Sequence, residues 1–256
     1  MNNNIKIGLV QYAPVWENKA ESCERIKNLI SNVSKIDLFV FPELTLTGFT
    51  MKSDKFVENL EGASYNFFSS LAKDKKSAII YGVIEKGKRK NFNTLVHLNN
   101  QGKIISTYRK IHPFSYSKEN VFYGKGKELV VTKVKGVKIG LSICYDLRFP
   151  ELYRFYGKEK IHLIIDIANW PDTRIEHWRS LLKARAIENQ CYVAGVNRVG
   201  DDPKLRYNGF SSVFDPMGKE IVAVENDEMI IGAEIDKTLV HEVRKKLPFL
   251  NDMRLI

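Results

Sequence analysis

The chain has 256 residues, of which 44% are hydrophobic, enough for a large buried core and unlike a disordered chain. It carries 40 Lys and Arg residues against 30 Asp and Glu residues, a net charge of +10 that suits a nucleic acid, an anionic membrane or an acidic substrate. No apolar run is long enough to span a bilayer, so we expect no membrane partner.

The first half of the chain predicts strands alternating with helices. Residues 5–13 alternate in polarity as a strand does, and residues 18–33 have helical spacing, with Asn18 as a plausible N-cap. Residues 37–41 are expected to form a strand buried on both faces, because the run from Leu38 to Phe41 is continuously apolar. The other predicted elements are a helix at 65–75 and strands at 77–84, 92–98 and 103–109.

The second half continues this alternation. The predicted strands lie at 128–134, 137–144, 161–168, 192–199, 209–214, 220–224 and 229–234. The predicted helices lie at 150–156, 173–189 and 238–246. Alternating strands and helices with hairpins among them predict a layered α/β architecture. No linker-like stretch divides the chain, so we expect a single domain over residues 1–256.

The densest basic group runs from Lys86 to Lys90, between two predicted strands. It is interpreted as a solvated hairpin loop, because no aromatic residues are interleaved with it as they are in nucleic-acid-binding segments. The other basic residues are scattered. We therefore expect no nucleic-acid partner.

The three cysteines are Cys23, Cys144 and Cys191. The number is odd and the spacings match no zinc pattern, so we expect neither a disulfide framework nor a metal site. The chain also begins without an apolar signal segment. A reducing interior fits these features, and we expect a cytoplasmic protein.

Cys144 is the candidate nucleophile. It ends the strand at 137–144 and precedes a helix, so the turn would expose the thiol, and the N–H groups that follow would point at a developing oxyanion. A helix N-terminus would also favour the thiolate. The alternative is a buried structural cysteine. Cys23, on the apolar stripe of a helix, and Cys191, between a helix and a strand, are expected to serve packing.

A cysteine nucleophile needs a base. Of the five histidines, only His112 lies in a loop beside other polar groups, and sequence alone leaves a pair of Cys144 and His112 open. A loop carboxylate is the alternative. Glu43 follows a buried strand at the sheet edge where ligand sites of α/β proteins gather. Lys110 follows another strand and would suit an oxyanion, and Glu119 lies nine positions further on.

Three segments give these residues a common context. Phe41-Pro42-Glu43, the segment 108–112 around Lys110, and the segment 143–151 around Cys144 resemble, in this order, the glutamate, lysine and cysteine motifs of the carbon–nitrogen hydrolase (nitrilase) superfamily. The resemblance runs nearly end to end, from Lys6 to about Ile235. It implies a four-layer αββα sandwich and no metal or organic cofactor.

The resemblance also implies roles for individual residues. Glu43 would be the general base, Lys110 would stabilise the tetrahedral intermediate, and Cys144 would attack the substrate. Glu119 matches the second glutamate that many members of the superfamily have. The backbone N–H of Tyr145 would complete the oxyanion site.

Within the superfamily the chain looks most like the omega-amidase group, through segments 111–114, 168–171, 176–178 and 184–190. That group removes ammonia from omega-amides of dicarboxylates such as 2-oxoglutaramate and 2-oxosuccinamate, and a small-molecule amide is therefore the expected partner. Such a substrate has a carboxylate at its far end. Arg148 is expected to pair with Asp146 or Glu151 instead of binding it. The candidate pocket walls are Phe114 and Trp170, and the candidate carboxylate ligands are Arg174 and Tyr116.

Four other functions remain open on the sequence. Three belong to the same chemistry: an N-carbamoyl amidohydrolase, an amidase for a peptide-like metabolite and, with less support from the motif around Cys144, a nitrilase. The fourth is a non-catalytic binding protein that uses the basic surface. The superfamily commonly pairs its subunits, so a homodimer is expected from the resemblance alone.

Overall fold

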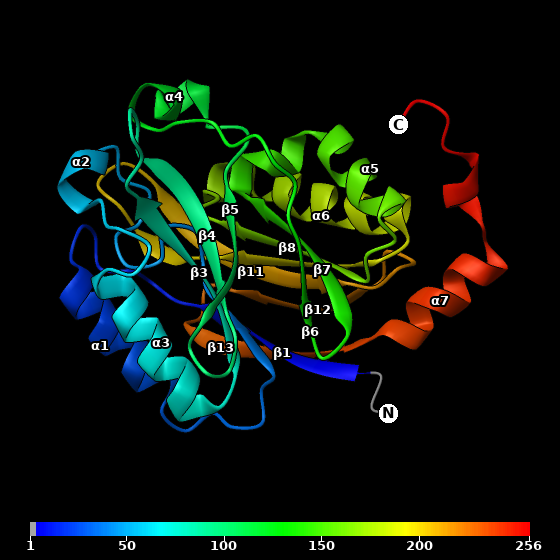
Figure 1. The fold of residues 1–256 in the computed structure, drawn as a ribbon, viewed down its shortest axis with the longest axis horizontal. Coiled ribbons are helices and arrows are strands. Elements are labelled where there is room, and N and C mark those ends of the chain that lie inside the picture. Colours follow the sequence, from blue (N-terminus) through cyan, green and yellow to red (C-terminus); the bar gives the residue numbers. More distant parts are fainter. Residues whose placement is uncertain (1–3) are drawn as a thin grey trace.

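The computed structural model describes residues 4–256, in which two β-sheets lie face to face (Figure 1). The first sheet pairs its central strands in parallel and its outer strands antiparallel. Its six strands follow the order β13 (Met229–Asp236), β1 (Asn4–Gln11), β2 (Leu38–Val40), β3 (Ala78–Glu85), β4 (Phe92–Leu98) and β5 (Ile104–Arg109).

The second sheet has three parallel strands at its centre and antiparallel strands on either side. Residues at the centre of such a sheet are covered on both faces, which explains the continuous apolar runs there. The strands follow the order β10 (Val199–Asp201), β11 (Arg206–Phe214), β9 (Tyr192–Asn197), β8 (Leu163–Ala168), β7 (Val137–Ile143) and β6 (Val131–Val134), and β12 (Glu220–Glu225) also pairs with β11.

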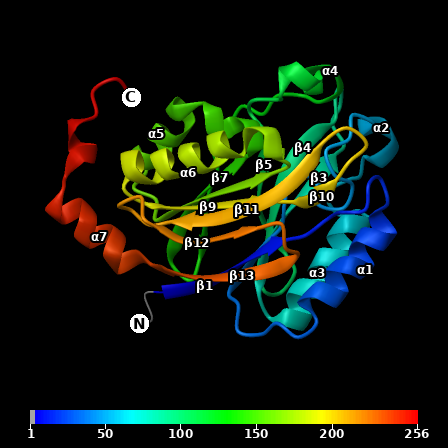
Figure 2. The same ribbon diagram turned by 180° about the vertical axis from the view of Figure 1, so that it is seen from behind.

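Helices cover the outer faces of both sheets (Figures 1 and 2). Ile26 and Phe68 bring two helices into one apolar cluster with the first sheet, and Leu152 and Trp178 bring two others into a cluster with the second. These helices are α1 (Lys19–Ile30) and α3 (Ala63–Lys75) on the first sheet, and α5 (Pro150–Lys158) and α6 (Ile175–Asn189) on the second.

The largest apolar cluster lies between the sheets. Leu9 and Val40 of the first sheet pack there with Leu141 and Ile165 of the second, and all four are fully buried. The layers therefore run helix, sheet, sheet, helix, and the expected four-layer αββα sandwich is confirmed.

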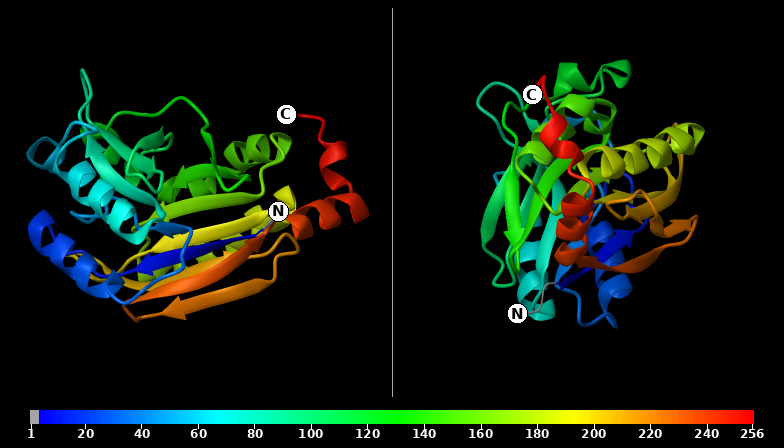
Figure 3. Two further views of the ribbon diagram at one scale, coloured as in Figure 1. Left: turned by 60° about the horizontal axis from the view of Figure 1, so that its bottom comes forward. Right: turned by 90° about the vertical axis from the view of Figure 1, so that its right-hand side faces the viewer.

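Short elements and the C-terminal helix complete the chain. Figure 3 shows the C-terminal helix at the side of the sandwich. Within residues 4–256, no helix is both long enough and apolar enough to cross a membrane. The elements are α2 (Ser53–Phe56), η1 (Ser115–Ser117), α4 (Glu119–Phe122), η2 (Cys144–Arg148), η3 (Asp172–Arg174), α7 (Lys237–Lys246) and η4 (Phe249–Asp252).

All the predicted strands and helices are present, with boundaries that differ by at most three residues. The side chain of Asn18 accepts a hydrogen bond from the Glu21 N–H and caps α1 as predicted. The basic segment from Lys86 to Lys90 is the connection between β3 and β4. One boundary was wrong where it matters most, because β7 ends at Ile143 and Cys144 begins the turn η2.

Candidate active site

Four predicted residues meet at one end of the two facing sheets. Glu43 lies shortly after β2, and Lys110 directly follows β5. Glu119 begins the short helix α4, and Cys144 begins η2 directly after β7. Segments far apart in the sequence are thus brought together because their strands end at the same edge of the sandwich.

Lys110 lies between two carboxylates. Its Nζ is 2.7 Å from Glu43 Oε1 and 2.9 Å from Glu119 Oε2, and all three side chains are fully buried. Burial lowers the pKa of Lys110, but the charges of Glu119 and Glu43 raise it by more than burial lowers it. The pKa therefore lies well above its ordinary value. Burial raises the pKa of Glu119, and the Glu43 charge adds to this against the opposing charge of Lys110. The lysine therefore stays an ammonium.

Two asparagines position Glu43. Asn93 on β4 donates from Nδ2 to Glu43 Oε1 at 2.7 Å and to Glu119 Oε1 at 2.9 Å. The backbone N–H of Asn169 donates to Glu43 Oε2 at 2.9 Å, and its Nδ2 donates to the Glu43 carbonyl oxygen at 2.7 Å. Both Glu43 carboxylate oxygens are therefore held in place, as a base of fixed geometry requires.

Cys144 occupies an unusual backbone conformation, with φ of +51°. Residues with a side chain rarely adopt this left-handed region, and such strain is often found at functional sites. The Cys144 Sγ lies 3.9 Å from the Asn169 carbonyl oxygen and reaches the surface of a pocket. Because Cys144 is less than fully buried and next to charged groups, its position differs from that of Cys191, which lies in the core.

The structure corrects the expectation that Cys144 is a thiolate at a helix N-terminus. Cys144 begins the five-residue 3₁₀ helix η2, and the α-helix α5 starts six residues later. Burial and the Glu43 charge raise the pKa of the Cys144 thiol well above its ordinary value, and Lys110 only partly offsets them. The resting Cys144 is therefore a thiol, and as a nucleophile it would need a base.

The His112 side chain contacts Asp146 and Phe149, and this arrangement does not favour it as the base for Cys144. Its ring Nδ1 lies 2.8 Å from Asp146 Oδ1, and the ring stacks on Phe149 with 3.8 Å between centroids. Asp146 in turn accepts hydrogen bonds from the Ile143 N–H and the Tyr108 hydroxyl. His112 thus belongs to the support of the Cys144 turn, and Glu43 is the carboxylate whose charge acts most strongly on Cys144.

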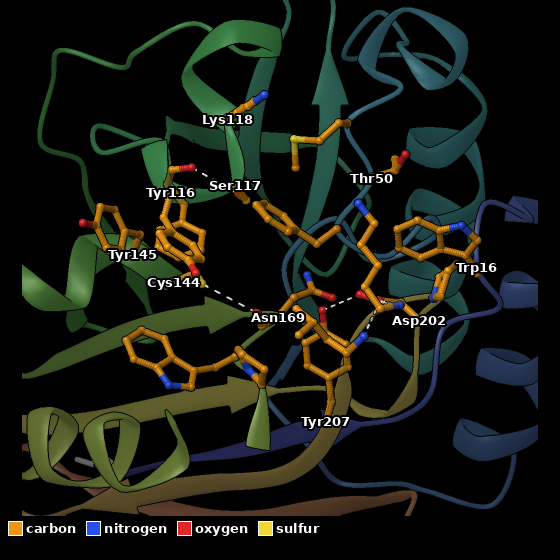
Figure 4. A pocket seen from close by; sticks show the side chains of 18 of the residues that line it. Trp16, Thr50, Tyr116, Ser117, Lys118, Cys144, Tyr145, Asn169, Asp202 and Tyr207 are labelled. Atoms are coloured by element: carbon orange, nitrogen blue, oxygen red, sulfur yellow. Dashed lines mark hydrogen bonds between the residues drawn. The ribbon is translucent and has the colours of Figure 1, made fainter. Parts of the chain in front are cut away.

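A pocket of about 720 Å³ opens above Cys144 (Figure 4). Cys144, Tyr145 and Asn169 line its inner part, while Trp16 and Tyr207 line another side. All the predicted substrate-binding residues line it, namely Phe114, Tyr116, Trp170 and Arg174. The pocket size falls in the range of small-molecule sites.

The individual pocket residues differ in exposure. Tyr116 is 87% exposed, whereas Trp170 is only 3% exposed and packs on Trp178, so Trp170 serves both the core and the wall. Trp170 Nε1 donates to the Arg174 carbonyl oxygen at 2.8 Å, which ties Arg174 to that wall. Phe114 lies 4.8 Å from the Tyr145 ring, centroid to centroid.

Arg148 was predicted wrongly. Its guanidinium lies over the Trp170 ring, 4.7 Å from the centroid, and Nη2 is 3.2 Å from His177 Nδ1. Within residues 4–256, Arg148 forms no ion pair with Asp146 or with Glu151. Asp146 is instead taken up by Tyr108, His112 and the Ile143 N–H. Arg148 therefore lines the pocket with its charge available.

Three polar residues of the site were not predicted. Asn93, Asp166 and Asn169 lie in or directly after strands, where an isolated polar residue gives only a weak signal of function. Asn169 stood in a segment that carried the family resemblance, but no role was assigned to it. The clue in each case is a polar side chain placed where the strand is otherwise fully buried.

Comparisons with known proteins agree with this geometry. Residues 6–245 match the family model described as carbon-nitrogen hydrolase. A 2-oxoglutaramate amidase of Bacillus subtilis (strain 168) is 33% identical over 251 residues, which is 97% of each chain. The omega-amidase YafV of Escherichia coli (strain K12) is 32% identical, over 97% of this chain and 96% of its own.

A solved structure is similar over almost its full length. It is that of XC1258 from Xanthomonas campestris, a CN-hydrolase superfamily protein with an arsenic adduct in the active site. The TM-score is 0.94 at 32% identity, with 99% of this chain and 98% of the other covered.

Proposed function

The chain belongs to the carbon–nitrogen hydrolase family, and we propose that its 256 residues form one domain that hydrolyses the terminal amide of small omega-amido dicarboxylates. The substrates would be of the 2-oxoglutaramate or 2-oxosuccinamate type, and the products the free acid and ammonia. The observation that carries this proposal is the position of Cys144 at the surface of the pocket, with Glu43 and Lys110 acting on it from below.

In the first half of the proposed reaction, Glu43 takes the Cys144 proton as Sγ attacks the amide carbon. The carbonyl oxygen becomes an oxyanion, which the Lys110 ammonium and the Tyr145 N–H stabilise. Glu43 then gives its proton to the amide nitrogen. The C–N bond breaks, ammonia leaves, and a thioester remains on Cys144.

In the second half, water attacks the thioester carbon and gives a proton to Glu43. The same oxyanion site stabilises the new tetrahedral intermediate. The C–S bond then breaks, Glu43 returns a proton to Sγ, and the acid leaves. Glu119 would act through Lys110 in both halves, because it holds the ammonium 2.9 Å away and balances its charge.

The charges around the pocket favour an anionic substrate. Arg148 and Arg174 both line the pocket. Burial and the nearby Arg174 charge lower the pKa of Arg148, as expected for two guanidinium groups that repel each other. We propose that they bind the far carboxylate of the substrate, with Tyr116 as a hydroxyl donor and Phe114 and Trp170 as walls. The full set of charged lining residues is Lys52, Lys118, Arg148, Arg174 and Lys204 against Glu17 and Asp202.

Ammonia release from a substrate panel tests the function. The panel holds 2-oxoglutaramate, 2-oxosuccinamate, succinamate, an N-carbamoyl amino acid and a nitrile, each with wild-type enzyme and with Cys144→Ala. We expect the highest kcat/KM on the oxo-amides, no turnover by Cys144→Ala, and an acyl adduct on Cys144 by mass spectrometry. Activity retained by Cys144→Ala would refute the mechanism.

The panel also separates the rival functions. A preference for the carbamoyl substrate would identify an N-carbamoyl amidohydrolase, and turnover of the nitrile alone a nitrilase. Salt-sensitive RNA or DNA binding without turnover of any substrate would favour the non-catalytic alternative.

We further propose a homodimer in the cytoplasm, on the family resemblance. Sedimentation of the purified protein over a range of concentrations tests the first part. Fractionation of the cells that make the protein tests the second. A monomer at micromolar concentration would contradict the dimer.

A further inference from the structure

Asp166 is a fully buried acid beneath the candidate nucleophile and has no part in the reaction described above. It lies on β8, and its Oδ1 accepts a hydrogen bond of 2.8 Å from the Cys144 backbone N–H. Its Oδ2 accepts hydrogen bonds of 2.7 Å from both the Ser142 and the Tyr153 hydroxyls. A buried carboxylate needs such donors, and here one of them is the peptide of Cys144 itself.

This contact falls where the backbone is strained. The left-handed region costs a residue with a side chain free energy, so contacts that hold the backbone there contribute to its geometry. At the end of β7, two consecutive peptide N–H groups are bound by side-chain carboxylates. Asp146 accepts from the Ile143 N–H at 3.1 Å, and Asp166 accepts from the Cys144 N–H. The two acids therefore fix the peptides on the N-terminal side of Cys144.

We propose that Asp166 is the positioning residue of the nucleophile, holding the Cys144 peptide so that Sγ faces Glu43 and the Tyr145 N–H faces the oxyanion. The inference rests on the proposed function, since it takes Cys144 as the nucleophile. Asp166 does not line the pocket, so its action on the substrate passes through Cys144.

The ionisation of Asp166 makes this role measurable. Burial raises its pKa to about 7, and the hydrogen bonds from Tyr153 and Ser142 limit the rise. The charged carboxylate binds an N–H more strongly than the neutral acid does. Hence kcat should fall as the pH falls through about 7. The Asp166 charge also raises the pKa of Cys144, which by itself would make the thiol a poorer nucleophile when Asp166 is ionised. This effect on kcat is opposite in sign to that of positioning.

The groups that face Asp166 are few. Tyr153 reaches it from α5, and Cys144 and Asp146 act on it from η2. On β9 its partner in register is Gly195, which cannot titrate. Arg185 of α6 lies over the Tyr153 ring, 5.1 Å from the centroid.

The test uses the full-length enzyme with Asp166→Asn, in which an amide oxygen can still accept from the Cys144 N–H but no longer titrates. We expect kcat on 2-oxoglutaramate to fall about 10- to 100-fold, as for a slightly misplaced nucleophile, with a much smaller change in KM. The fall in kcat that the wild type shows toward acid near pH 7 should be absent from the variant.

Two tyrosines of α5 give a matched control. Tyr153→Phe removes a hydroxyl that stabilises the charged form of Asp166, so the acid limb of the kcat profile should move to higher pH. Tyr156→Phe removes an equally buried hydroxyl that donates to the Leu141 carbonyl oxygen, and the limb should stay in place. This pair keeps the test decisive if Asp166→Asn does not fold.

The outcomes distinguish a failure of the positioning role from a failure of the proposed function. If kcat of Asp166→Asn stays within about twofold of wild type with an unchanged pH profile, the positioning role is refuted. An unshifted limb in Tyr153→Phe refutes it equally. If Cys144→Ala keeps its activity, the proposed function itself fails, whatever the Asp166 variant does.

Discussion

Replacing Lys110 by methionine should destabilise the protein in a pH-dependent way. Lys110→Met keeps the length of the side chain and removes the one ammonium between Glu43 and Glu119, all three being fully buried. Removing one partner of a buried ion pair costs about 3–5 kcal/mol of unfolding free energy, because the remaining charges are left uncompensated. Here two carboxylates would face each other.

The sign of the pH dependence follows from linkage. In the wild type, the raised pKa of Lys110 means that its stabilisation is complete below the pKa of an unfolded lysine, about 10.4, and is lost only above it. In the variant, the pKa of Glu119 would rise further, because the Lys110 charge that opposes the effects of burial and of Glu43 is gone. Glu119 would then favour folding only while protonated, so that stability falls as the pH rises above about 4.

Urea unfolding at pH 5 and pH 8, followed by tryptophan fluorescence, measures this difference. We expect the gap between wild type and Lys110→Met to widen toward pH 8, reaching about 3–5 kcal/mol. Lys27→Met is the control, because Lys27 forms an exposed pair with Glu24 and its loss should leave stability almost unchanged. A gap of the same size at both pH values would refute the reasoning. The same variant should lose about 10²- to 10³-fold in kcat as an oxyanion donor.

Because burial and Glu43 raise the pKa of Cys144, its alkylation by iodoacetamide should still accelerate above about pH 9; a plateau near pH 7 would show a thiolate instead. Arg148→Gln should raise KM for 2-oxoglutaramate about tenfold or more and change KM for the neutral amide butyramide little, in steady-state ammonia assays. Asp166 contributes its full stability below about pH 4 and loses about 4 kcal/mol as the pH rises through about 7, because its folded-state pKa of about 7 exceeds the ordinary 3.8. In urea titrations, Asp166→Asn should therefore lose less stability than wild type between pH 4.5 and 8.5, and an identical loss would contradict this.

The sheets were predictable because their signal is local. Residues 38–41 and 163–165 are continuous apolar runs, and such runs specify strands covered on both faces. The backbone conformation at Cys144 could not be predicted from the sequence. The peptide N–H groups there are bound by two carboxylates, one of which lies 22 residues further along the chain. The left-handed backbone of a cysteine has no signature in a sequence.

The candidate site divides in the same way. Glu43, Lys110 and Cys144 each stand in a short motif, so their grouping followed from a resemblance between segments. Arg148 was assigned to the wrong partner because nearness in sequence was taken for nearness in space. In η2 the carboxylate of Asp146 turns to the Ile143 N–H and to His112, while the Arg148 side chain extends over Trp170 into the pocket.

The charges explain why the proposed nucleophile, Cys144, would need no thiolate in the resting enzyme. One ammonium and two carboxylates share a buried space, so their combined charge when ionised is negative and opposes ionisation of Cys144. In the proposed mechanism the thiol stays protonated until a carbonyl group is in place to take up charge. Attack would then place negative charge on an oxygen facing Lys110, where a fixed cation is most effective. Such a site would resist alkylation and oxidation at rest and still react quickly with its amide, because its catalytic groups are already oriented.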